Sequence, residues 1–279
     1  RLLKKWITHP LLSKQSIEER LKVVEYLNQD FLLTEEIKVM LEGVQDLERL
    51  ITKVVFKIAN ARDVLAIKQS LKVFHDIKTK VNISLVPFLD KEIPSEIIDL
   101  IEIAIDQNPP LSLREGQMIK KGYNSELDAL RLIKSDSKKV LVDLEKKEIE
   151  QTKIPSLKIR YNKVFGYYIE LTHKNKDKAP AHYIRKQTLV TGERFITEEL
   201  KEIETKILTA EEKITSLEYN LFTEILEKVE QKKSVMQEIA ISIATLDCLI
   251  SFSFTSNKYK YTKPEINETN TIELVDCRH

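Results

Sequence analysis

The sequence SLKIRYNKVFGYYIELTHKNKDKAPAHYIRKQTLVTGERFI, at residues 156–196, decides the fold, because it separates two long helical stretches. It contains nine Lys and Arg residues and three Asp and Glu residues, a net charge of +6, whereas the whole chain carries +1. The rest of the chain is therefore net acidic. A nearly neutral chain that gathers its positive charge in one segment is typical of proteins that bind a polyanion.

This segment predicts a small sheet. Apolar and basic residues alternate from residue 157 to 161, which is the period of a strand with one buried face. Three strands are expected, at residues 157–161, 165–171 and 183–196. A turn at Asn162 and Lys163 joins the first two, and a polar loop over residues 174–181 precedes the third. The three Tyr and one Phe between residues 161 and 168 are expected in the sheet core rather than on a base-stacking surface.

Two long charged helices flank the sheet. The first is expected from about residue 114 to 153, where Pro155 ends it, and it would be roughly 50 Å long. The second is expected from Thr197 to about Lys232. Its apolar residues recur at alternating intervals of three and four, the spacing of a heptad seam. These are Leu200, Ile203, Ile207, Ala210, Ile214, Leu217 and Leu221. The pair predicts an antiparallel helical arm with the sheet at its end.

The remaining residues are also predicted to be helical. Residues 1–114 form a compact helical domain, and the apolar residues 234–254 form a helix that returns to it and is buried there. Helices are expected to start at Ser16 as a capping residue, at Thr34 with a run to Phe56, at Ala61, and at Ser95 with a run to Gln107. One or two strands are expected around Ile272 and Leu274. The predicted fold class is mainly α, with one small β-rich domain.

Composition excludes several kinds of protein. The chain is 42% hydrophobic and 32% charged, with five glycines, which favours long helices over a loop-rich β fold. Cys248 and Cys277 are far apart and form no CxxC, which favours a reduced, intracellular protein. No run of about 18 apolar residues is present, so no membrane span is expected. The chain opens within an amphipathic pattern and without Met, so we expect part of a longer polypeptide.

No catalytic or cofactor site is expected within the 279 residues. The glycines form neither GxxxxGK[ST] nor GxGxxG, and no Cys and His residues have zinc spacing. The five histidines are interpreted as isolated surface residues, namely His9, His75, His173, His182 and His279. We therefore predict no metal, no nucleotide and no enzyme activity for this chain alone.

The basic segment offers donors for phosphate oxygens. Lys and Arg side chains at strand ends and turns, together with amide and hydroxyl groups, contact phosphates in nucleic-acid complexes. No helix is predicted there that could enter a major groove, so backbone binding is favoured over base readout. The predicted DNA-binding residues are Asn162, Lys163, Arg185, Lys186, Thr188, Thr191 and Arg194. The alternative is that the basic residues only form a solvated face.

Several stretches resemble the MutS family of DNA mismatch-repair proteins. The strongest are NKVFGYYIE at residues 162–170, YIRKQTL at 183–189 and ERFITEELK at 193–201. Further similarity lies at residues 1–12, 46–50, 61–63 and 122–128. These stretches keep one order and cover nearly the whole chain.

The resemblance implies a domain division. Residues 1–114 would be a core or lever domain, 115–155 the outgoing lever helix, 156–196 a β-rich clamp domain, 197–258 the return lever helix and core-closing helix, and 259–279 the start of an ATPase domain. In the family the clamp contacts the backbone of double-stranded DNA without reading its sequence. The lever helices would couple that contact to an ATPase domain absent from this chain.

The resemblance also implies partners and a location. Full-length members use ATP and Mg and act with a second MutS-type subunit, and no membrane is expected. The location would be the cytoplasm or nucleoid in a bacterium, and the nucleus or an organelle in a eukaryote. Two alternatives stay open: a structural coiled-coil arm for protein–protein assembly, and the clamp and lever of a meiotic MutS homologue.

Two positions depart from the family pattern. Bacterial relatives often have Lys-Asn-Ala where this chain has Val190-Thr191-Gly192, which removes one cation and one amide from an implied phosphate contact. Cys277 stands where the family usually has Gly.

Overall fold

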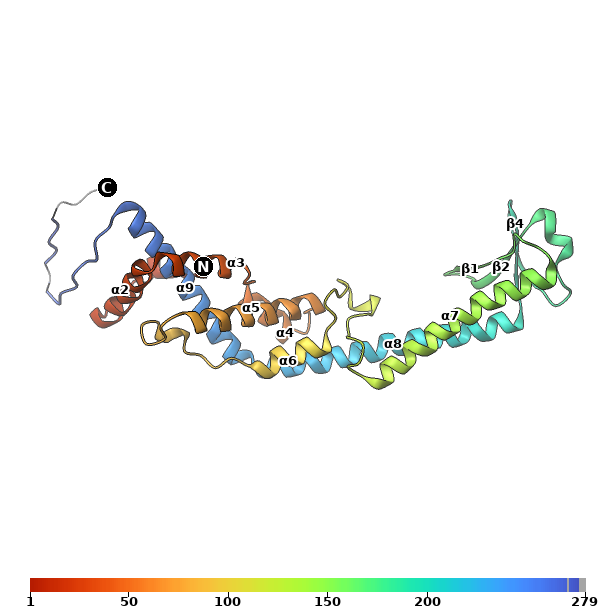
Figure 1. Cartoon of the computed structure of the whole chain (residues 1–279), viewed down its shortest axis with the longest axis horizontal. Coiled ribbons are helices and arrows are strands. Elements are labelled where there is room, and N and C mark those ends of the chain that lie inside the picture. Colours follow the sequence, from red (N-terminus) through yellow and green to blue (C-terminus); the bar gives the residue numbers. More distant parts are fainter. Residues whose placement is uncertain (270, 276–279) are drawn as a thin grey trace. The chain divides into compact units, whose positions relative to one another are not determined.

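The structure is a computed structural model, and it describes residues 1–269 and 271–275. The chain divides into two compact units, which we call unit 1 (residues 1–105 and the described residues from 223 onward) and unit 2 (residues 106–222). Unit 1 is helical, and unit 2 contains long helices and a sheet (Figure 1). The prediction of a mainly helical chain with a small antiparallel sheet is confirmed.

The central helix of unit 1 is α9 (Lys233–Tyr259). It contacts α1 (Leu2–Thr8), α2 (Lys14–Gln29), α3 (Phe31–Glu42), α4 (Leu47–Val55), α5 (Ala61–Lys80) and the 3-10 helix η1 (Pro87–Leu89). Its side chains Met236, Ile239 and Leu249 are buried, as predicted for a helix that returns to the helical domain.

α9 bears on the expectation that the chain has no membrane span. It is long and apolar enough to cross a membrane by length and composition, and 44% of its most apolar stretch is buried. Because it packs against the other helices of unit 1, we interpret it as a core helix, which passes the same test.

Side-chain caps explain where the helices of unit 1 begin. The helix predicted from Thr34 to Phe56 is in fact α3 and α4. Asp30 accepts a hydrogen bond from the Leu33 amide, and Asp46 accepts one from the Arg49 amide, so each helix has its own start. The helix predicted at Ser16 begins earlier, at Lys14.

Two predicted starts in unit 1 are confirmed. α5 begins at Ala61, behind a capping box of Asn60 and Asp63. α6 (Ser95–Ala104) begins at Ser95 and ends three residues before the predicted Gln107.

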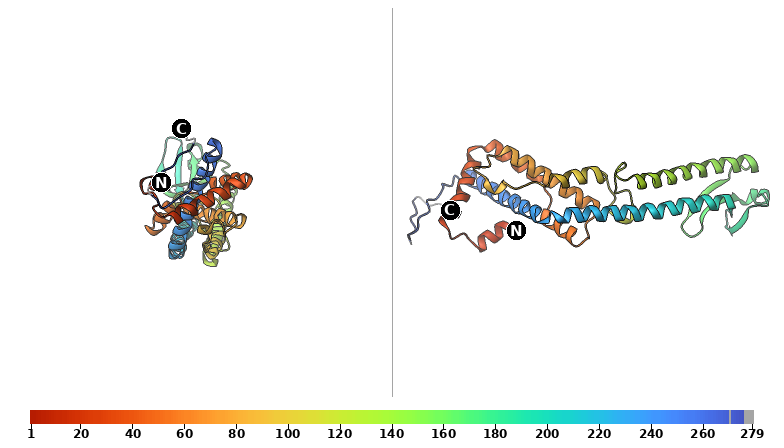
Figure 2. Two further views of the ribbon diagram at one scale, coloured as in Figure 1. Left: turned by 90° about the vertical axis from the view of Figure 1, so that its left-hand side faces the viewer. Right: turned by 90° about the horizontal axis from the view of Figure 1, so that it is seen from below.

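In unit 2, α7 (Ser125–Thr152) and α8 (Glu198–Gln231) lie side by side and antiparallel (Figures 1 and 2). Three ion pairs join them, and residue numbers rise along α8 as they fall along α7. The pairs are Lys147–Glu199 at 3.0 Å, Lys134–Glu211 at 2.9 Å and Arg131–Glu218 at 2.5 Å. The predicted antiparallel pair is therefore confirmed. The predicted seam of α8 is buried at Leu200, Ile203, Ile207, Ala210, Ile214 and Leu221.

The start of α7 was predicted about eleven residues too early. Gly116, Gln117 and Gly122 have positive φ angles, which a right-handed helix does not contain. Asn124 then caps α7 by accepting a hydrogen bond from the Leu127 amide. The segment from Asp106 to this cap is irregular, apart from the 3-10 helix η2 (Leu113–Glu115).

The sheet has four strands rather than three. They are β1 (Lys158–Asn162), β2 (Gly166–Thr172), β3 (Ile184–Thr188) and β4 (Gly192–Ile196), all antiparallel in the order β1-β2-β4-β3. The single strand predicted over residues 183–196 is a hairpin, because the chain turns between Thr188 and Gly192. The predicted polar loop contains the 3-10 helix η3 (His173–Lys178). We call residues 156–196 the sheet module.

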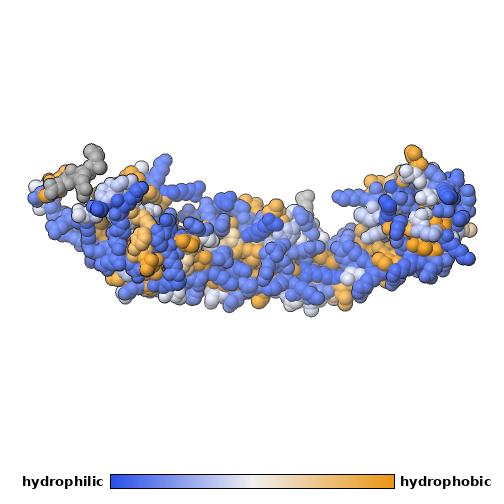
Figure 3. Space-filling view, turned by 45° about the horizontal axis from the view of Figure 1, so that its top comes forward, coloured by the Kyte–Doolittle hydropathy of each residue, from blue (hydrophilic) through white to orange (hydrophobic). Residues whose placement is uncertain are grey.

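An apolar cluster joins the sheet module to both long helices. It contains Leu141 and Leu144 from α7, Leu200, Ile203 and Ile207 from α8, and Ile154, Leu157, Ile169, Leu171, Tyr183 and Phe195 from the sheet module and the turn before it. On the face of the molecule shown in Figure 3, hydrophilic residues cover most of the surface, and hydrophobic residues form small patches.

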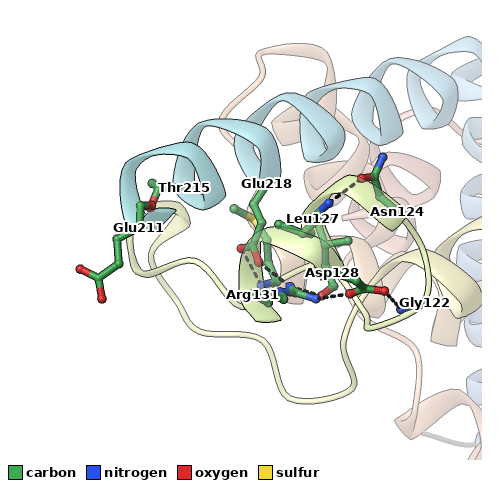
Figure 4. A network of polar contacts seen from close by, with 10 residues as sticks. Gly122, Asn124, Leu127, Asp128, Arg131, Glu211, Thr215 and Glu218 are labelled. Atoms are coloured by element: carbon green, nitrogen blue, oxygen red, sulfur yellow. Dashed lines mark hydrogen bonds and ion pairs between the residues drawn. The ribbon is translucent and has the colours of Figure 1, made fainter. Parts of the chain in front are cut away.

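A buried polar network holds α7 and α8 together at the end of unit 2 away from the sheet (Figure 4). Glu218 of α8 is fully buried, and it pairs with Arg131 of α7. Arg131 also donates to the Ile119 carbonyl at 2.7 Å, and the Met118 amide donates to Glu218 at 3.4 Å. Asp128 accepts from the Gly122 amide at 2.8 Å. The irregular segment before α7 is thereby fastened to both helices.

The tail contains no strand among its described residues. Residues 261–269 and 271–275 are neither strand nor helix, and Ile272 and Leu274 are exposed, so the strands predicted there are wrong. The predictions made for Cys277 and His279 lie outside the described residues.

Candidate nucleic-acid interface

The two faces of the sheet differ in chemistry. Alternation along β2 and β4 places Ile169, Leu171 and Phe195 against the apolar cluster. Tyr168 and Arg194 therefore lie on the other face, which we call the outer face.

Polar side chains link neighbouring strands on this outer face. Arg160 of β1 lies 3.8 Å from the Glu170 carboxylate of β2. Arg194 of β4 donates to Gln187 of β3 at 2.8 Å, and its guanidinium lies 4.3 Å from the ring centre of Tyr168. The outer face is thus a polar surface cross-linked from β1 to β3.

The aromatic residues near β1 and β2 divide between core and surface. Tyr168 is buried, and Tyr167 packs against the apolar cluster, as predicted. Burial raises the pKa of Tyr167 above its usual range, with smaller contributions from nearby Glu211, Tyr161 and Glu204. Tyr161 and Phe165 are exposed, so the prediction that all four lie in the core is wrong for these two.

The turn between β1 and β2 carries two of the predicted site residues. Asn162 accepts a hydrogen bond from the Val164 amide at 2.8 Å, and Lys163 is exposed. Gly166 has a φ of 73°, and a Cβ there would lie 1.6 Å from Glu204 Oε1. That carboxylate accepts from the Tyr167 amide at 3.0 Å, so α8 fixes the position of this turn.

The hairpin of β3 and β4 carries the other five predicted DNA-binding residues. Arg185, Lys186, Thr188 and Thr191 are exposed, whereas Arg194 is half-buried. Arg185 lies 3.8 Å from the Glu193 carboxylate. At the tip, the Leu189 carbonyl lies 2.7 Å from the His173 ring, and Val190 is 97% exposed.

A Cβ on Gly192 would lie 2.2 Å from the Leu171 carbonyl oxygen. Only glycine therefore fits where the hairpin meets β2. The close approach of Gly192 to Leu171 fixes the position of the hairpin tip relative to β2.

The predicted site residues form two groups rather than one. β2 begins at Gly166, which pairs with Asn162, and ends at Thr172, which pairs with Gly192. At about 3.3 Å per residue, the length of β2 separates the two turns by about 20 Å. Asn162 and Lys163 lie at one end of the sheet, and Thr188 and Thr191 lie at the other.

Charge pairing distinguishes the basic residues of the sheet module. Lys158, Arg160 and Arg185 have acidic partners. Five exposed lysines have no ion pair within the part of the chain that the structure describes. They are Lys163, Lys174, Lys176, Lys178 and Lys186. Three of these lie on η3 and were not among the predicted site residues, although the alternating lysines of HKNKDK were a visible signal.

The exposed groups of the sheet module can hold an anion. Among residues 1–269 and 271–275, no group of three or more His, Cys, Asp and Glu side chains could hold a metal ion. The exposed groups of the sheet module are ammonium, guanidinium, amide and hydroxyl groups, which donate hydrogen bonds to phosphate oxygens.

Comparisons with known proteins agree with the earlier resemblance. A family model described as MutS domain III matches residues 1–253. The chain is similar to proteins named DNA mismatch repair protein MutS from several organisms, and all of the chain is covered in each case. Identity is 45% with that of Pelotomaculum thermopropionicum, 44% with that of Methanosarcina acetivorans and 44% with that of Bacillus cytotoxicus. The chain covers 33%, 32% and 32% of these relatives, so it spans about a third of their length.

Proposed function

This chain belongs to the MutS family, and we propose on that premise that its sheet module is a clamp for the backbone of double-stranded DNA. In this proposal α7 and α8 are lever helices that couple DNA contact to an ATPase domain outside the 279 residues. ATP, Mg and a second MutS-type subunit would act in the longer protein, inside the cell.

The observation that carries the proposal is the set of five exposed lysines that form no ion pair with any described residue. An exposed lysine that is not held in an ion pair is free to approach a phosphate. Their distribution over two ends of the sheet suits an extended polyanion. A separation of about 20 Å corresponds to about six nucleotides along one DNA strand, at 3.4 Å each.

The outer face supports contact with the DNA backbone rather than with base edges. It carries no α-helix, and Arg194 and Arg160 on this face are already held by Gln187 and Glu170, which leaves them fewer donors for base edges. Binding of this kind depends on charge and therefore weakens steeply as salt rises.

The test is duplex binding by the 279-residue chain over a range of salt concentrations. The variant Lys163→Ala with Lys186→Ala removes one unpaired lysine from the turn between β1 and β2 and one from the middle of β3. Each lost phosphate contact lowers the slope of log affinity against log salt by about 0.9, so we expect the slope to fall by about 1.8.

A matched control is Lys138→Ala with Lys213→Ala. Both lysines are exposed on the long helices, outside the sheet module, and the change in charge is the same. An equal loss of slope in both variants would mean that only overall charge matters, and the clamp assignment would fail.

A second candidate function is protein–protein assembly through the arm. Leu132, Ile133, Val140 and Val142 of α7 are each about half exposed, which leaves an apolar surface for a partner helix. Sedimentation over a range of protein concentrations would separate the candidates. A self-associating chain with negligible affinity for duplex DNA would favour assembly.

A further inference from the structure

We propose that Arg194 is a positioning residue, which acts through Gln187 to hold a β-bulge at Lys186 and so fixes where Arg185 and Lys186 stand on the edge strand. This inference rests on the proposed function, because it assigns a task to those two residues in DNA binding. It changes the role of Arg194 from the phosphate contact predicted from the sequence.

The bulge is visible in the pairing of β3 with β4. Arg185 pairs with Phe195 and Gln187 pairs with Arg194, so two steps along β3 match one step along β4. Lys186 is therefore the extra residue. Arg185, opposite Phe195, lies on the side of the apolar cluster, and Gln187 lies with Arg194 on the outer face. In a regular strand, Arg185 and Gln187 would share one face, and Gln187 could not meet Arg194. Arg185 and Lys186 are both exposed on this edge strand, and the bulge sets their positions.

Arg194 is placed to hold this register. Its Nη1 donates to Gln187 Oε1 at 2.8 Å, directly across from it in the ladder. Its guanidinium also lies over the ring of Tyr168 on the neighbouring strand β2, 4.3 Å from the ring centre. Tyr168 is only 5% exposed, so packing holds the ring on which the Arg194 guanidinium lies. The Arg194 side chain therefore connects the bulged edge strand β3 to the central strand β2.

The same contacts make Arg194 a poor phosphate ligand. It is half-buried, and its Nε is buried without a hydrogen-bond partner. A buried N–H without a partner is costly, so the surrounding structure imposes this guanidinium position. Arg185, by contrast, has a side chain that is 63% exposed.

The experiment uses two variants that keep the charge of the chain. Arg194→Lys keeps the cation but loses the planar group that bonds Gln187 and stacks on Tyr168. Gln187→Leu removes the acceptor without changing charge. If Arg194 only positions β3, both variants should lower the salt slope of duplex binding by one to two units, about as much as Arg185→Ala with Lys186→Ala. In that double-variant background, Gln187→Leu should have no further effect.

If Arg194 were a phosphate contact, Arg194→Lys and Gln187→Leu would both keep the original slope. That result would overturn the inference. Gln151→Leu, at an exposed amide near the end of α7, is the matched control and should change nothing.

A second readout does not depend on DNA. Hydrogen exchange at the amides of residues 184–188 should become faster in Gln187→Leu and in Arg194→Lys, because β3 loses the hydrogen bond between Arg194 and Gln187. Unchanged protection would overturn the inference even if the clamp assignment holds. An unchanged slope in Arg185→Ala with Lys186→Ala, together with faster exchange in Gln187→Leu, would instead count against the proposed function alone.

Discussion

At the sheet end of unit 2, α7 and α8 are joined to the strands by apolar side chains, whereas at the other end they are joined by one fully buried carboxylate and its partners. Apolar contact is not directional, so the sheet end can adjust by small shifts without losing much free energy. A buried ion pair needs its partners in place, and we therefore expect Arg131 and Glu218 to set the register of α7 against α8.

The irregular segment before α7 adds to this difference. Its backbone groups bond to the same network, through the Met118 amide, the Ile119 carbonyl and the Gly122 amide. The sheet end also has polar contacts to the two helices. The Tyr183 hydroxyl donates to Glu148 at 2.6 Å, the Ile159 amide donates to Glu145 at 2.7 Å, and the Tyr167 amide donates to Glu204 at 3.0 Å. The bonds to Arg131 and Glu218 fix the positions of α7 and α8 relative to each other at the end of unit 2 away from the sheet.

The largest effect is expected from Arg131→Met, which leaves the Glu218 carboxylate buried without its cation. Removing one partner of a buried pair costs about 3–5 kcal/mol. Denaturant unfolding should report this loss, and hydrogen exchange should place it at the segment before α7. Adding Glu218→Leu should restore most of the stability, because no charge is then left buried. A loss below about 1 kcal/mol in Arg131→Met would contradict the idea that the Arg131–Glu218 ion pair holds α7 and α8 in register.

Leu157→Ala tests the apolar end. Leu157 is fully buried in the apolar cluster, and truncating such a leucine costs about 2–5 kcal/mol through lost burial and the cavity left behind. The loss should be independent of salt and appear in the exchange of the sheet amides. Leu132→Ala, at a leucine of α7 that is 60% exposed, is the control and should cost less than about 0.5 kcal/mol. Equal losses in the two variants would mean that the cluster does not hold this end.

Tyr183→Phe should cost about 1–3 kcal/mol, because Glu148 is only 3% exposed and loses its hydrogen bond. Burial, followed by the bond to Glu148, raises the pKa of Tyr183 above its usual range. A group with a raised folded-state pKa stabilises the fold fully below its unfolded pKa of about 10, and this stabilisation is lost as the pH rises beyond that value.

Unfolding measured from pH 7 to pH 11 should therefore show an alkaline loss in the original chain that Tyr183→Phe lacks. The same alkaline loss in both proteins would assign it to other groups.

The smallest effect is expected from Glu199→Gln. Lys147 and Glu199 join α7 to α8 near the sheet at 3.0 Å, but both side chains are 51% exposed. Exposed pairs contribute less than about 1 kcal/mol, and salt screens them. The difference from the original chain should vanish at high salt. A loss that persists there would show that charge also matters at the sheet end.

Local sequence signals predicted the long elements well. The spacing of apolar residues from Leu200 to Leu221 identified the buried side of α8, because that periodicity belongs to the helix itself. The start of α7 was missed, because the pattern of apolar residues continues through Gly116 and Gly122 although their backbone is left-handed. The β3–β4 hairpin was missed because Leu189-Val190-Thr191 lacks the Asn-Gly or Asp-Gly signal of a tight turn.

The sequence predicted which stretch of the chain contains the candidate site, but not how its side chains are arranged on the surface. The charge of residues 156–196 marked the right part of the chain, because composition needs no three-dimensional information. Which cations are free depends on where acidic side chains lie. Lys158 meets Glu145 from α7, whereas Lys163 and Lys186 meet no acidic partner in the described part of the chain.

By itself, the sequence determined the helices, the basic segment and the family, since each depends on residues that are near one another along the chain. Only the tertiary structure decided that Glu218 pairs with Arg131, 87 residues away, and that Arg194 lies between Tyr168 and Gln187. It also decided that the two turns lie at opposite ends of the sheet. Ion pairs and hydrogen bonds between side chains act over a few ångströms, so their partners are set by how helices and strands pack rather than by the order of residues.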